Sequence, residues 1–545
     1  MPAPLSAPAH DYQLLVKSLL LTPVVDDPEQ EIVYRDQVRY TYREFRARVA
    51  RLANALGRLG VRAGDTVAVM DWDSHRYLEC FFAVPMIGAV LHTINVRLLP
   101  EQILFTIQHA EDQVLLVNSE FLPLLDQLRG RISQVRRYVL LHDGPEPPKL
   151  DGAFDGEYEA LLCAEAPDRE FPDFDERTRA TIFYTTGTTG RPKGVFFNHR
   201  QLVLHTLATL AGGGTARHGR FRQGDVYMPL TPMFHVHAWG IPYNATALGV
   251  KQVYPGRYQP EMLLSLIAKE KVTFSHCVPT ILHMLLASPA SEQVDLSGWT
   301  VLIGGSALSK ALCLAALARG IDVLGGYGLS ETCPALAVAH LTPEMLKLPP
   351  EEQVEIRCQT GRSSPMVDLR IVDEQMRELP RDGKSTGEIV ARSPWLTPGY
   401  FKDQEGSQAL WAGGWLHTGD VAYRDSRGYV KITDRAKDIV KVGGEWVSSL
   451  ELEDLLAKHP AVSEVAVIGV PDEEWGEHPM ALVVRRAGPQ VEVAEQDLVN
   501  HAQSFAAKGV VSRYAVKYLA VKFVDAIEKT SVGKINKLAL RKKHA

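Results

Sequence analysis

The sequence predicts an α/β fold with a large N-terminal domain of α/β subdomains, a small β unit and a small α+β C-terminal domain. Short apolar segments rich in β-branched residues alternate with segments whose apolar residues recur at helical spacing. That alternation is typical of strands joined by crossover helices in mostly parallel sheets. From residue 369 onward the long helical segments give way to short strands separated by turn residues, which indicates an antiparallel unit.

The first long helix is expected to begin after Thr41. Thr41-Tyr-Arg-Glu44 is a capping box, and apolar residues follow at helical spacing as far as Leu59, next to Gly60. A buried helix is expected at 79–87. The segments expected as strands of the large domain are 66–70, 113–117, 181–184, 251–254, 272–274 and 300–303.

The C-terminal third divides into two parts. Strands are expected at 369–372, 387–391 and 429–432, and charged residues then lead into the glycine pair at 443–444. Ser448-Ser-Leu-Glu451 is a second capping box, and strands are expected at 462–470 and 481–484. We therefore divide the chain into a large domain at 1–434, with its β unit at about 367–434, and a small domain at 435–545.

Composition excludes several classes of protein. The 59 basic and 65 acidic residues give a net charge of −6, which argues against a nucleic-acid partner. No block of like charges is present that could form a polybasic membrane anchor. The longest apolar run, Cys80 to Leu91, is too short for a bilayer and contains Pro85. The six cysteines form no CxxC pair. We expect a cytoplasmic protein with small-molecule partners, no nucleic acid and no transmembrane segment.

The strongest local motif is the loop Tyr184–Gly194, which directly follows an expected strand. It holds three glycines, four threonines and one lysine. Glycines let backbone N–H groups surround an anion, threonine hydroxyls add donors, and Lys193 adds a mobile positive charge. Because Gly194 follows Lys193, the loop is not a Walker A motif. We interpret it as a triphosphate cradle rather than a flexible turn.

Six segments together resemble the adenylate-forming superfamily, which includes acyl-CoA synthetases, nonribosomal adenylation domains and luciferases. The resemblance is strongest to medium- and long-chain fatty acyl-CoA synthetases. The segments are Tyr184–Gly194, Gly304–Ala307, Gly326–Thr332, Trp415–Asp420, Asp434–Lys441 and Thr530–Lys534. They follow the order of the family along nearly the whole chain. The resemblance implies the adenylate-forming ligase fold, in which the small C-terminal domain is mobile.

The resemblance also implies an ATP site. Tyr327, between two glycines, offers a flat face for adenine, and Asp420 can accept bonds from both ribose hydroxyls. Thr189 and Glu331 would share Mg²⁺, which prefers few protein carboxylates combined with phosphate oxygens. The full set of expected ATP- or AMP-binding residues is Thr185, Thr186, Gly187, Thr188, Thr189, Gly190, Lys193, Gly305, Ser306, Gly326, Tyr327, Gly328, Ser330, Asp420, Arg435 and Lys441.

Two residues are expected to be catalytic by resemblance. Lys534, in a turn of small residues, would stabilise the charge that develops when a carboxylate attacks the α-phosphorus of ATP, an effect commonly worth about 3–4 kcal/mol. His235 would line the acyl and phosphate site, with a core histidine as the alternative. Lys437 matches the hinge about which the small domain rotates. Glu528 stands where the family usually has proline.

The acyl and CoA site is expected at Val236, Trp239, Gly443, Gly444 and Trp446. Trp239 matches a residue that gates the acyl tunnel in fatty acyl-CoA synthetases, and Gly443-Gly444 would face the pantetheine channel. The sequence near Val236 has no aspartate of the kind that holds an α-amine. A carboxylic acid with an apolar tail is therefore favoured over an amino acid.

The resemblance implies an ATP-dependent acid–thiol ligase that forms acyl-AMP with release of pyrophosphate and then transfers the acyl group to coenzyme A. ATP, Mg²⁺ and coenzyme A are the expected cofactors, and a medium-chain fatty acid is the expected substrate. Two alternatives stay open: an acyl-AMP ligase that loads a carrier protein, and a CoA ligase for a short-chain, thioether or aromatic acid. A homodimer is also left open.

Overall fold

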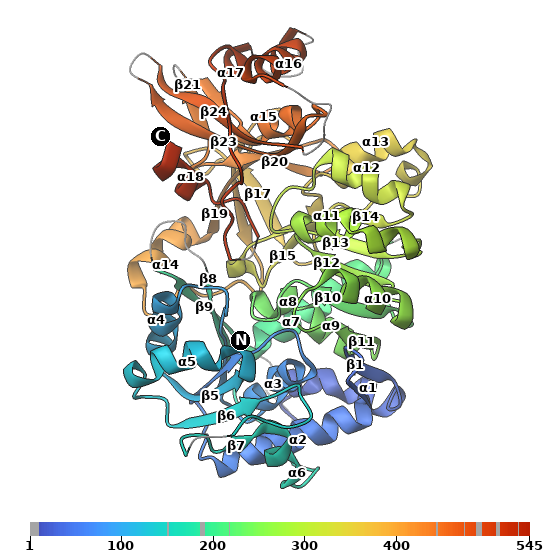
Figure 1. Ribbon diagram of the computed structural model, residues 1–545, viewed down its shortest axis with the longest axis vertical. Helices are drawn as coiled ribbons and strands as arrows, with labels where there is room; N and C mark the ends of the chain where they lie inside the picture. The colour runs from blue at the N-terminus through green and yellow to red at the C-terminus, as the bar shows by residue number, and fades with distance from the viewer. Residues whose placement is uncertain are drawn as a thin grey trace.

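In the computed structural model, a large N-terminal domain carries a small C-terminal domain at one end of its long axis (Figure 1). The structure describes residues 10–149, 152–185, 191–216, 218–442, 445–472, 475–486, 493–507, 513–531 and 533–544. No helix in these ranges combines the length and the apolar character needed to cross a bilayer. The large α/β domain, the small β unit and the small C-terminal domain expected from the sequence are all present.

The first sheet of the large domain holds the strands that flank the Gly/Thr-rich loop. Its strands are parallel except for β9, which runs antiparallel to β8 and pairs Lys193 with Thr185. The two ends of the loop therefore meet at one edge of the sheet. The order is β7 (Gly156–Glu157), β6 (Arg137–Leu141), β5 (Asp112–Asn118), β3 (Thr66–Met70), β4 (Val90–Thr93), β8 (Arg179–Thr185), β9 (Lys193–Asn198).

The second sheet has nine strands, parallel in its centre and antiparallel at both ends. The strand expected at 272–274 instead begins at Phe274, because Lys271 adopts a left-handed φ of 56° and the Val272 N–H closes the end of the preceding helix. The order is β16 (Arg362–Ser363), β15 (Ala335–Val338), β14 (Asp322–Gly328), β13 (Thr300–Ile303), β12 (Phe274–Cys277), β10 (Val226–Leu230), β11 (Lys251–Tyr254), β1 (Glu31–Tyr34), β2 (Val38–Thr41).

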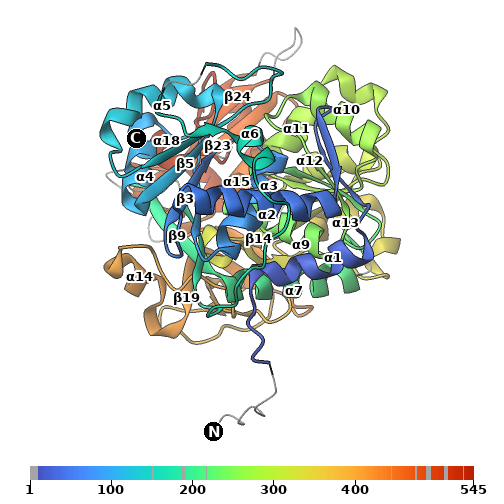
Figure 2. The same ribbon diagram turned by 90° about the horizontal axis from the view of Figure 1, so that it is seen from below.

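Helices separate the two sheets and cover their outer faces (Figure 2). Side chains alternate along β3: Val67 and Val69 enter the core between the sheets, whereas Ala68 and Met70 face the opposite cluster. The helices between the sheets are α2 (Tyr42–Arg58), α3 (His75–Met86), α7 (His199–Thr215) and α9 (Ile241–Ala247). The outer helices are α4 (Pro100–Ala110), α5 (Leu122–Leu128), α10 (Pro260–Glu270), α11 (Pro279–Ala287) and α12 (Lys310–Ala318).

The two predicted helices of this layer differ in how well the sequence located them. The capping box of α2 is confirmed, since Thr41 accepts a bond from the Glu44 N–H and the Glu44 side chain returns one to Thr41. The helix expected at 79–87 begins earlier, at His75, with Ser74 as its N-cap. Polar residues in its first turn hid the start. They are nonetheless buried, and Arg76 forms an ion pair with Asp143 at 2.5 Å.

The remaining elements form the β unit and the small domain. The predicted antiparallel unit is a four-stranded sheet of β17 (Asp368–Val372), β18 (Gly387–Arg392), β19 (Leu416–Arg424) and β20 (Val430–Arg435). The small-domain sheet contains β21 (Val440–Val442), β22 (Glu445–Val447), β23 (Val462–Asp472), β24 (Gly476–Arg485) and β25 (Ala520–Phe523). Its helices are α15 (Ser449–Leu456), α16 (Glu495–Ala507), α17 (Arg513–Lys517) and α18 (Lys537–His544).

Shorter helices complete the large domain. They are α1 (Leu21–Asp26), α6 (Tyr158–Cys163), α8 (Val236–Trp239), α13 (Pro350–Arg357) and α14 (Gln404–Leu410). In the small domain, Ser448 is the N-cap of α15 and accepts a bond from the Glu451 N–H at 3.1 Å. Among the described residues, the Glu451 side chain returns no bond to the Ser448 N–H, so the expected capping box is half formed.

Candidate active site

The expected nucleotide residues lie where strand ends of the large domain meet a loop of the small domain. Thr185 is the last residue of β8 and is half-buried. Residues 186–190 and 443–444, which carry seven of the expected contacts, lie outside the described residues, as does the side chain of Trp446. The other expected residues of the site belong to the described part of the chain.

Lys193 and Glu331 are linked through a tyrosine that sequence reasoning missed. The Tyr400 hydroxyl donates a hydrogen bond to Glu331 Oε1 at 2.8 Å, and the Lys193 ammonium lies 4.3 Å from the centre of the Tyr400 ring. The same ammonium is 3.7 Å from the Asp403 carboxylate. These two contacts of Lys193 at the protein surface are weak. The ammonium can therefore leave them to bind a triphosphate.

The expected adenine and ribose residues form one network. The Tyr327 hydroxyl donates to Asp420 Oδ2 at 2.6 Å, while Arg435 Nε lies 3.1 Å from Asp420 Oδ1. Pairing of Asp420 with Arg435 across β19 and β20 sets this geometry. Burial and the Asp420 charge raise the pKa of the Tyr327 hydroxyl, which stays protonated. Each carboxylate oxygen keeps a second lone pair for a ribose hydroxyl.

Glycines of the expected motifs make room for close contacts. A Cβ on Gly328 would lie 1.5 Å from the Pro334 carbonyl oxygen, so no larger residue fits there. A Cβ on Gly305, whose φ is +78°, would lie 3.2 Å from Lys534 Cε. Gly326 packs against Leu302, and Ser306 and Ser330 lie beside these turns.

Lys534 reaches the nucleotide side from the small domain. Its loop is closed by a bond from the Thr530 N–H to the Lys534 carbonyl at 2.7 Å. The loop docks on the large domain, where Asn95 donates to the Ser531 hydroxyl at 3.0 Å. Burial, and then the Arg435 charge, lower the pKa of Lys534 to about 8, while Asp420 and Glu331 oppose that shift. Lys534 is therefore electrostatically coupled to the expected ribose and metal residues.

His235 lines a small cavity of about 40 Å³ next to this loop. Arg97, Thr231, Tyr258 and Gly533 also line it. Burial, Lys534 and Arg97 lower the pKa of His235 to about 3, so the imidazole is neutral at pH 7. A neutral imidazole orients a neighbouring group through a hydrogen bond and does not act as an acid. Arg97 was not identified from the sequence, because a lone arginine after a strand carries no local signal.

Trp239, expected at the acyl site, lies on a strained turn. Val236, His237, Ala238 and Trp239 all have positive φ values, between 47° and 59°. Each such residue costs about 1–2 kcal/mol, and strain of this kind persists only where surrounding structure imposes it. The centres of the Trp239 and His276 rings are 5.0 Å apart. A Cβ added to Gly304 would lie 2.9 Å from the Trp239 indole. Trp239 therefore fills the space between β12 and the end of β13.

The hinge and linker residues are less closely tied to the site. Lys437 is an exposed residue between the end of β20 and Asp438, and partial desolvation and the Arg435 charge lower its pKa. Lys441 is exposed on β21, and its backbone N–H donates to Glu477 at 2.9 Å. In the described part of the chain, the Lys441 side chain forms no ion pair with Asp420 or Glu331.

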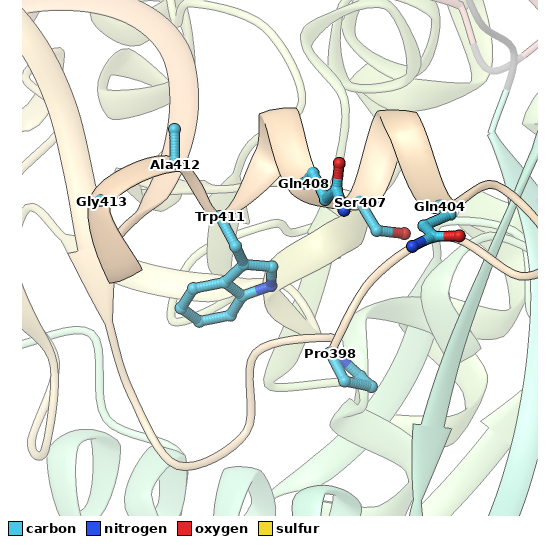
Figure 3. Close-up of a pocket in the computed structure, with 7 residues that line it drawn as sticks. All are labelled: Pro398, Gln404, Ser407, Gln408, Trp411, Ala412 and Gly413. Carbon is cyan, nitrogen blue, oxygen red and sulfur yellow. The ribbon is translucent and has the colours of Figure 1, made fainter.

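An open hollow of about 520 Å³ lies beside α14 and is separate from the residues above (Figure 3). The Trp411 indole N–H donates to the Thr397 carbonyl at 3.0 Å, and the Thr397 N–H donates to the Glu331 carbonyl at 2.9 Å. This region supports the segment that carries Glu331. The hollow is lined by Pro398, Gln404, Ser407, Gln408, Trp411, Ala412 and Gly413.

The donors near Glu331 fit a magnesium ion carried by a triphosphate. Within the described ranges, no group of three or more His, Cys, Asp and Glu side chains is placed to hold a metal by itself. A single carboxylate, with phosphate oxygens and waters as the other ligands, is an arrangement that Mg²⁺ favours. Thr189, the second expected ligand, lies outside the described residues.

Two known protein families match most of the chain. The AMP-binding enzyme family matches residues 23–401, and the AMP-binding enzyme C-terminal domain matches residues 451–534. The chain belongs to the AMP-binding enzymes. The first match contains the loop 184–194, Tyr327 and Glu331, and the second ends on Lys534.

Curated relatives cover almost the whole chain. A long-chain-fatty-acid–CoA ligase of Thermus thermophilus is 40% identical over 512 residues, 93% of this chain and 90% of the relative. A 3-methylmercaptopropionyl-CoA ligase of Ruegeria lacuscaerulensis is 37% identical, over 97% of this chain and 98% of the relative. A medium-chain-fatty-acid–CoA ligase of Ectopseudomonas oleovorans is 37% identical, over 93% and 91%.

Solved structures of this AMP-binding family show the same fold. An anthranilate CoA ligase in complex with anthranoyl-AMP superposes with a TM-score of 0.83 at 25% identity, covering 98% of both chains. A fatty acyl CoA synthetase of Mycobacterium tuberculosis superposes with a TM-score of 0.72 at 27% identity, over 97% of this chain and 98% of the other.

The depressed pKa of Lys534 predicts a pH dependence. Lysine is charged below its pKa, so the free enzyme loses this cation as the pH rises through about 8. The kcat/KM for ATP in acyl-AMP formation, which reports the free enzyme, should be level below pH 8 and fall about tenfold per pH unit well above it. Bound triphosphate favours the charged form, so kcat should hold to higher pH.

The matched control for that profile is Lys534→Arg. Arginine stays charged throughout the range, so its kcat/KM, although lower overall, should show no fall above pH 8. Identical profiles for the two enzymes would assign the titration to another group.

Proposed function

We propose that this AMP-binding enzyme is an ATP-dependent acyl-CoA ligase, with a large domain at 1–434 and a small domain at 435–545. One observation carries the proposal: Lys534 of the small domain lies within electrostatic reach of Arg435, Asp420 and Glu331, the residues expected around ribose, phosphate and metal. β20 ends at Arg435, so the proposed boundary falls at the end of the last strand of the β unit.

The first half-reaction joins two anions. A carboxylate oxygen of the acid attacks the α-phosphorus of ATP, the bond to the pyrophosphate oxygen breaks, and acyl-AMP and pyrophosphate form. Tyr327 would stack on adenine while Asp420 holds the ribose hydroxyls. Lys534 would lie against the phosphoryl oxygens, where a fixed cation stabilises developing negative charge. Magnesium supplies charge neutralisation of the triphosphate when bound, and Glu331 and Thr189 would hold it.

The second half-reaction needs a different arrangement of the small domain. Rotation about Lys437 would withdraw Lys534 and bring Gly443 and Gly444 to the pantetheine channel. The thiolate of coenzyme A then attacks the acyl carbonyl carbon, and AMP leaves. No nucleophilic side chain is needed, because coenzyme A supplies the nucleophile. Burial raises the pKa of the Cys277 and Cys333 thiols, which suits a packing role for them.

A medium-chain fatty acid is the substrate class we propose, because relatives named for medium- and long-chain acids match over nine-tenths of the chain. A short thioether acid is the second candidate, since the relative named for 3-methylmercaptopropionyl-CoA matches 97% of this chain and 98% of its own length. The proposal includes a cytoplasmic enzyme and leaves room for a homodimer.

A panel of acids tests this function. Acids from C2 to C18, with 3-methylmercaptopropionate and an aromatic acid, are offered with ATP and Mg²⁺, and pyrophosphate, AMP and acyl-CoA are measured with and without coenzyme A. We expect steady turnover only with coenzyme A and a peak near C6–C12. Steady AMP release without acyl-CoA, in the presence of coenzyme A, would contradict a CoA ligase.

Trp239→Ala in the same panel tests the acyl side. Removing the indole opens apolar volume between His276 and Gly304, and each added methylene in such a space is worth about 1–3 kcal/mol. The preferred chain length should shift or broaden, with little change in the KM for ATP. An unchanged ranking of acids with only a raised KM for ATP would place Trp239 outside the acyl pocket.

A further inference from the structure

A second set of contacts joins the two domains at the end of β20. Asp434, which is 2% exposed, belongs to the last strand of the β unit. Its Oδ2 accepts hydrogen bonds from both the backbone N–H and the hydroxyl of Ser449, at 2.6 and 2.7 Å. Ser449 is the first residue of α15 in the small domain. A carboxylate is well placed there, because the first N–H groups of a helix lack partners within the helix.

The same serine receives a buried cation. The Lys537 ammonium donates to Ser449 Oγ at 2.5 Å and forms an ion pair with Glu453 at 2.7 Å. Lys537 is 8% exposed and is the first residue of α18, three positions after Lys534. A continuous polar chain therefore runs from Asp434 in the large domain to the base of the loop that carries Lys534.

Burial makes these contacts strong. Burial raises the pKa values of Asp434 and Glu453, and the charge of Lys537 acts against both shifts. Separating Asp434 from Ser449 would remove two hydrogen bonds from a buried carboxylate, which would keep the bond from the Arg435 N–H at 2.8 Å, and this loss is costly unless water enters. By contrast, the bond from Asn95 to Ser531, which also crosses the domains, joins two neutral groups and contributes less.

The polar chain crosses the expected hinge. Asp434 precedes Lys437, whereas Ser449, Glu453 and Lys537 follow it. A rotation of the small domain about Lys437 therefore has to break the bonds between Asp434 and Ser449. Ser448 adds one further bond of this kind, from its hydroxyl to the Thr433 carbonyl.

We propose that Asp434, Ser449 and Lys537 form a latch that holds the small domain in the orientation where Lys534 faces the nucleotide site. The latch must open before acyl transfer to coenzyme A. The three residues are positioning residues: they act through the placement of Lys534 and touch neither ATP nor the acid. The proposal rests on the proposed function and on Lys437 as the hinge.

Asp434→Asn tests the latch, because it removes the charge at nearly constant volume. Two rates are measured: acyl-AMP formation in a single turnover, and acyl transfer from supplied acyl-AMP to coenzyme A. The ratio of the first to the second should fall about tenfold, since a hydrogen bond to a charged group is lost only in the latched orientation. Ser449→Ala should lower the ratio of the two rates as well. If Asp434→Asn does not fold, the ratio measured in Ser449→Ala tests the latch.

Asp438→Asn is the matched control. Asp438 pairs with Arg541 of α18 at 2.8 Å, but both residues follow the hinge, so this pair does not have to break on rotation. Loss of the ion pair between Asp438 and Arg541 should lower the melting temperature and leave the ratio of the two rates unchanged. An equal fall of both rates in Asp434→Asn and Ser449→Ala, or no change in their ratio, would overturn the latch.

Limited trypsin digestion separates the latch from the proposed function. Cleavage between Arg435 and Lys441 needs no substrate, and it should be faster in Ser449→Ala, which leaves residues 434–441 unchanged, than in the wild-type enzyme. If the wild-type enzyme formed no acyl-AMP from any acid, the proposed function would fail while this comparison still decided the latch. Equal cleavage rates would count against it.

Discussion

Three cations, Lys193, Arg435 and Lys534, surround a site whose described acidic groups are Glu331, Asp420 and Asp403. Like charges at short range repel, and here Arg435 and burial together lower the pKa of Lys534 to about 8. Asp420 satisfies Arg435 directly, and Lys193 is held by an aromatic face and by Asp403. A polyphosphate is the ligand that relieves this crowding.

The glycines and the small-domain contacts bring the three cations to one site without placing them in contact with one another. Gly305 leaves room for the Lys534 side chain, and Gly328 lets β14 turn against Pro334. Polar bonds to the small domain meet at the ends of helices: Asp434 accepts bonds at the start of α15, and Lys537 is the first residue of α18. Contacts of that kind suit the rotation that we propose between the two half-reactions.

Local sequence patterns located the strands and the motif residues well. Apolar runs predicted β3, β11 and β13 at their observed bounds, and the capping box predicted the start of α2. The pattern failed where polar residues are buried, as at the first turn of α3, where Arg76 finds its partner Asp143 at a distance of 67 residues. It also failed at β12, which begins at Phe274 and not at Val272 because Lys271 adopts a left-handed conformation.

The same limit applies to the site. Lys534, Asp420 and Tyr327 lie in short motifs, so their neighbourhood in the sequence identified them. Tyr400 bonds to Glu331 across 69 residues, and Lys537 bonds to Ser449 across 88, and neither pair leaves a local pattern. Such contacts depend on tertiary folding, which brings together groups that are ordinary surface residues when read in the sequence.

The central claim is that Lys534 serves acyl-AMP formation alone, because it faces the nucleotide in only one orientation of the small domain. The most direct measurement compares the two half-reactions in Lys534→Ala, using acid-dependent exchange of labelled pyrophosphate into ATP and acyl transfer from supplied acyl-AMP to coenzyme A. The account predicts that exchange falls by about a hundredfold or more, while transfer stays within a few-fold of the wild-type rate. An equal loss in both half-reactions would contradict it.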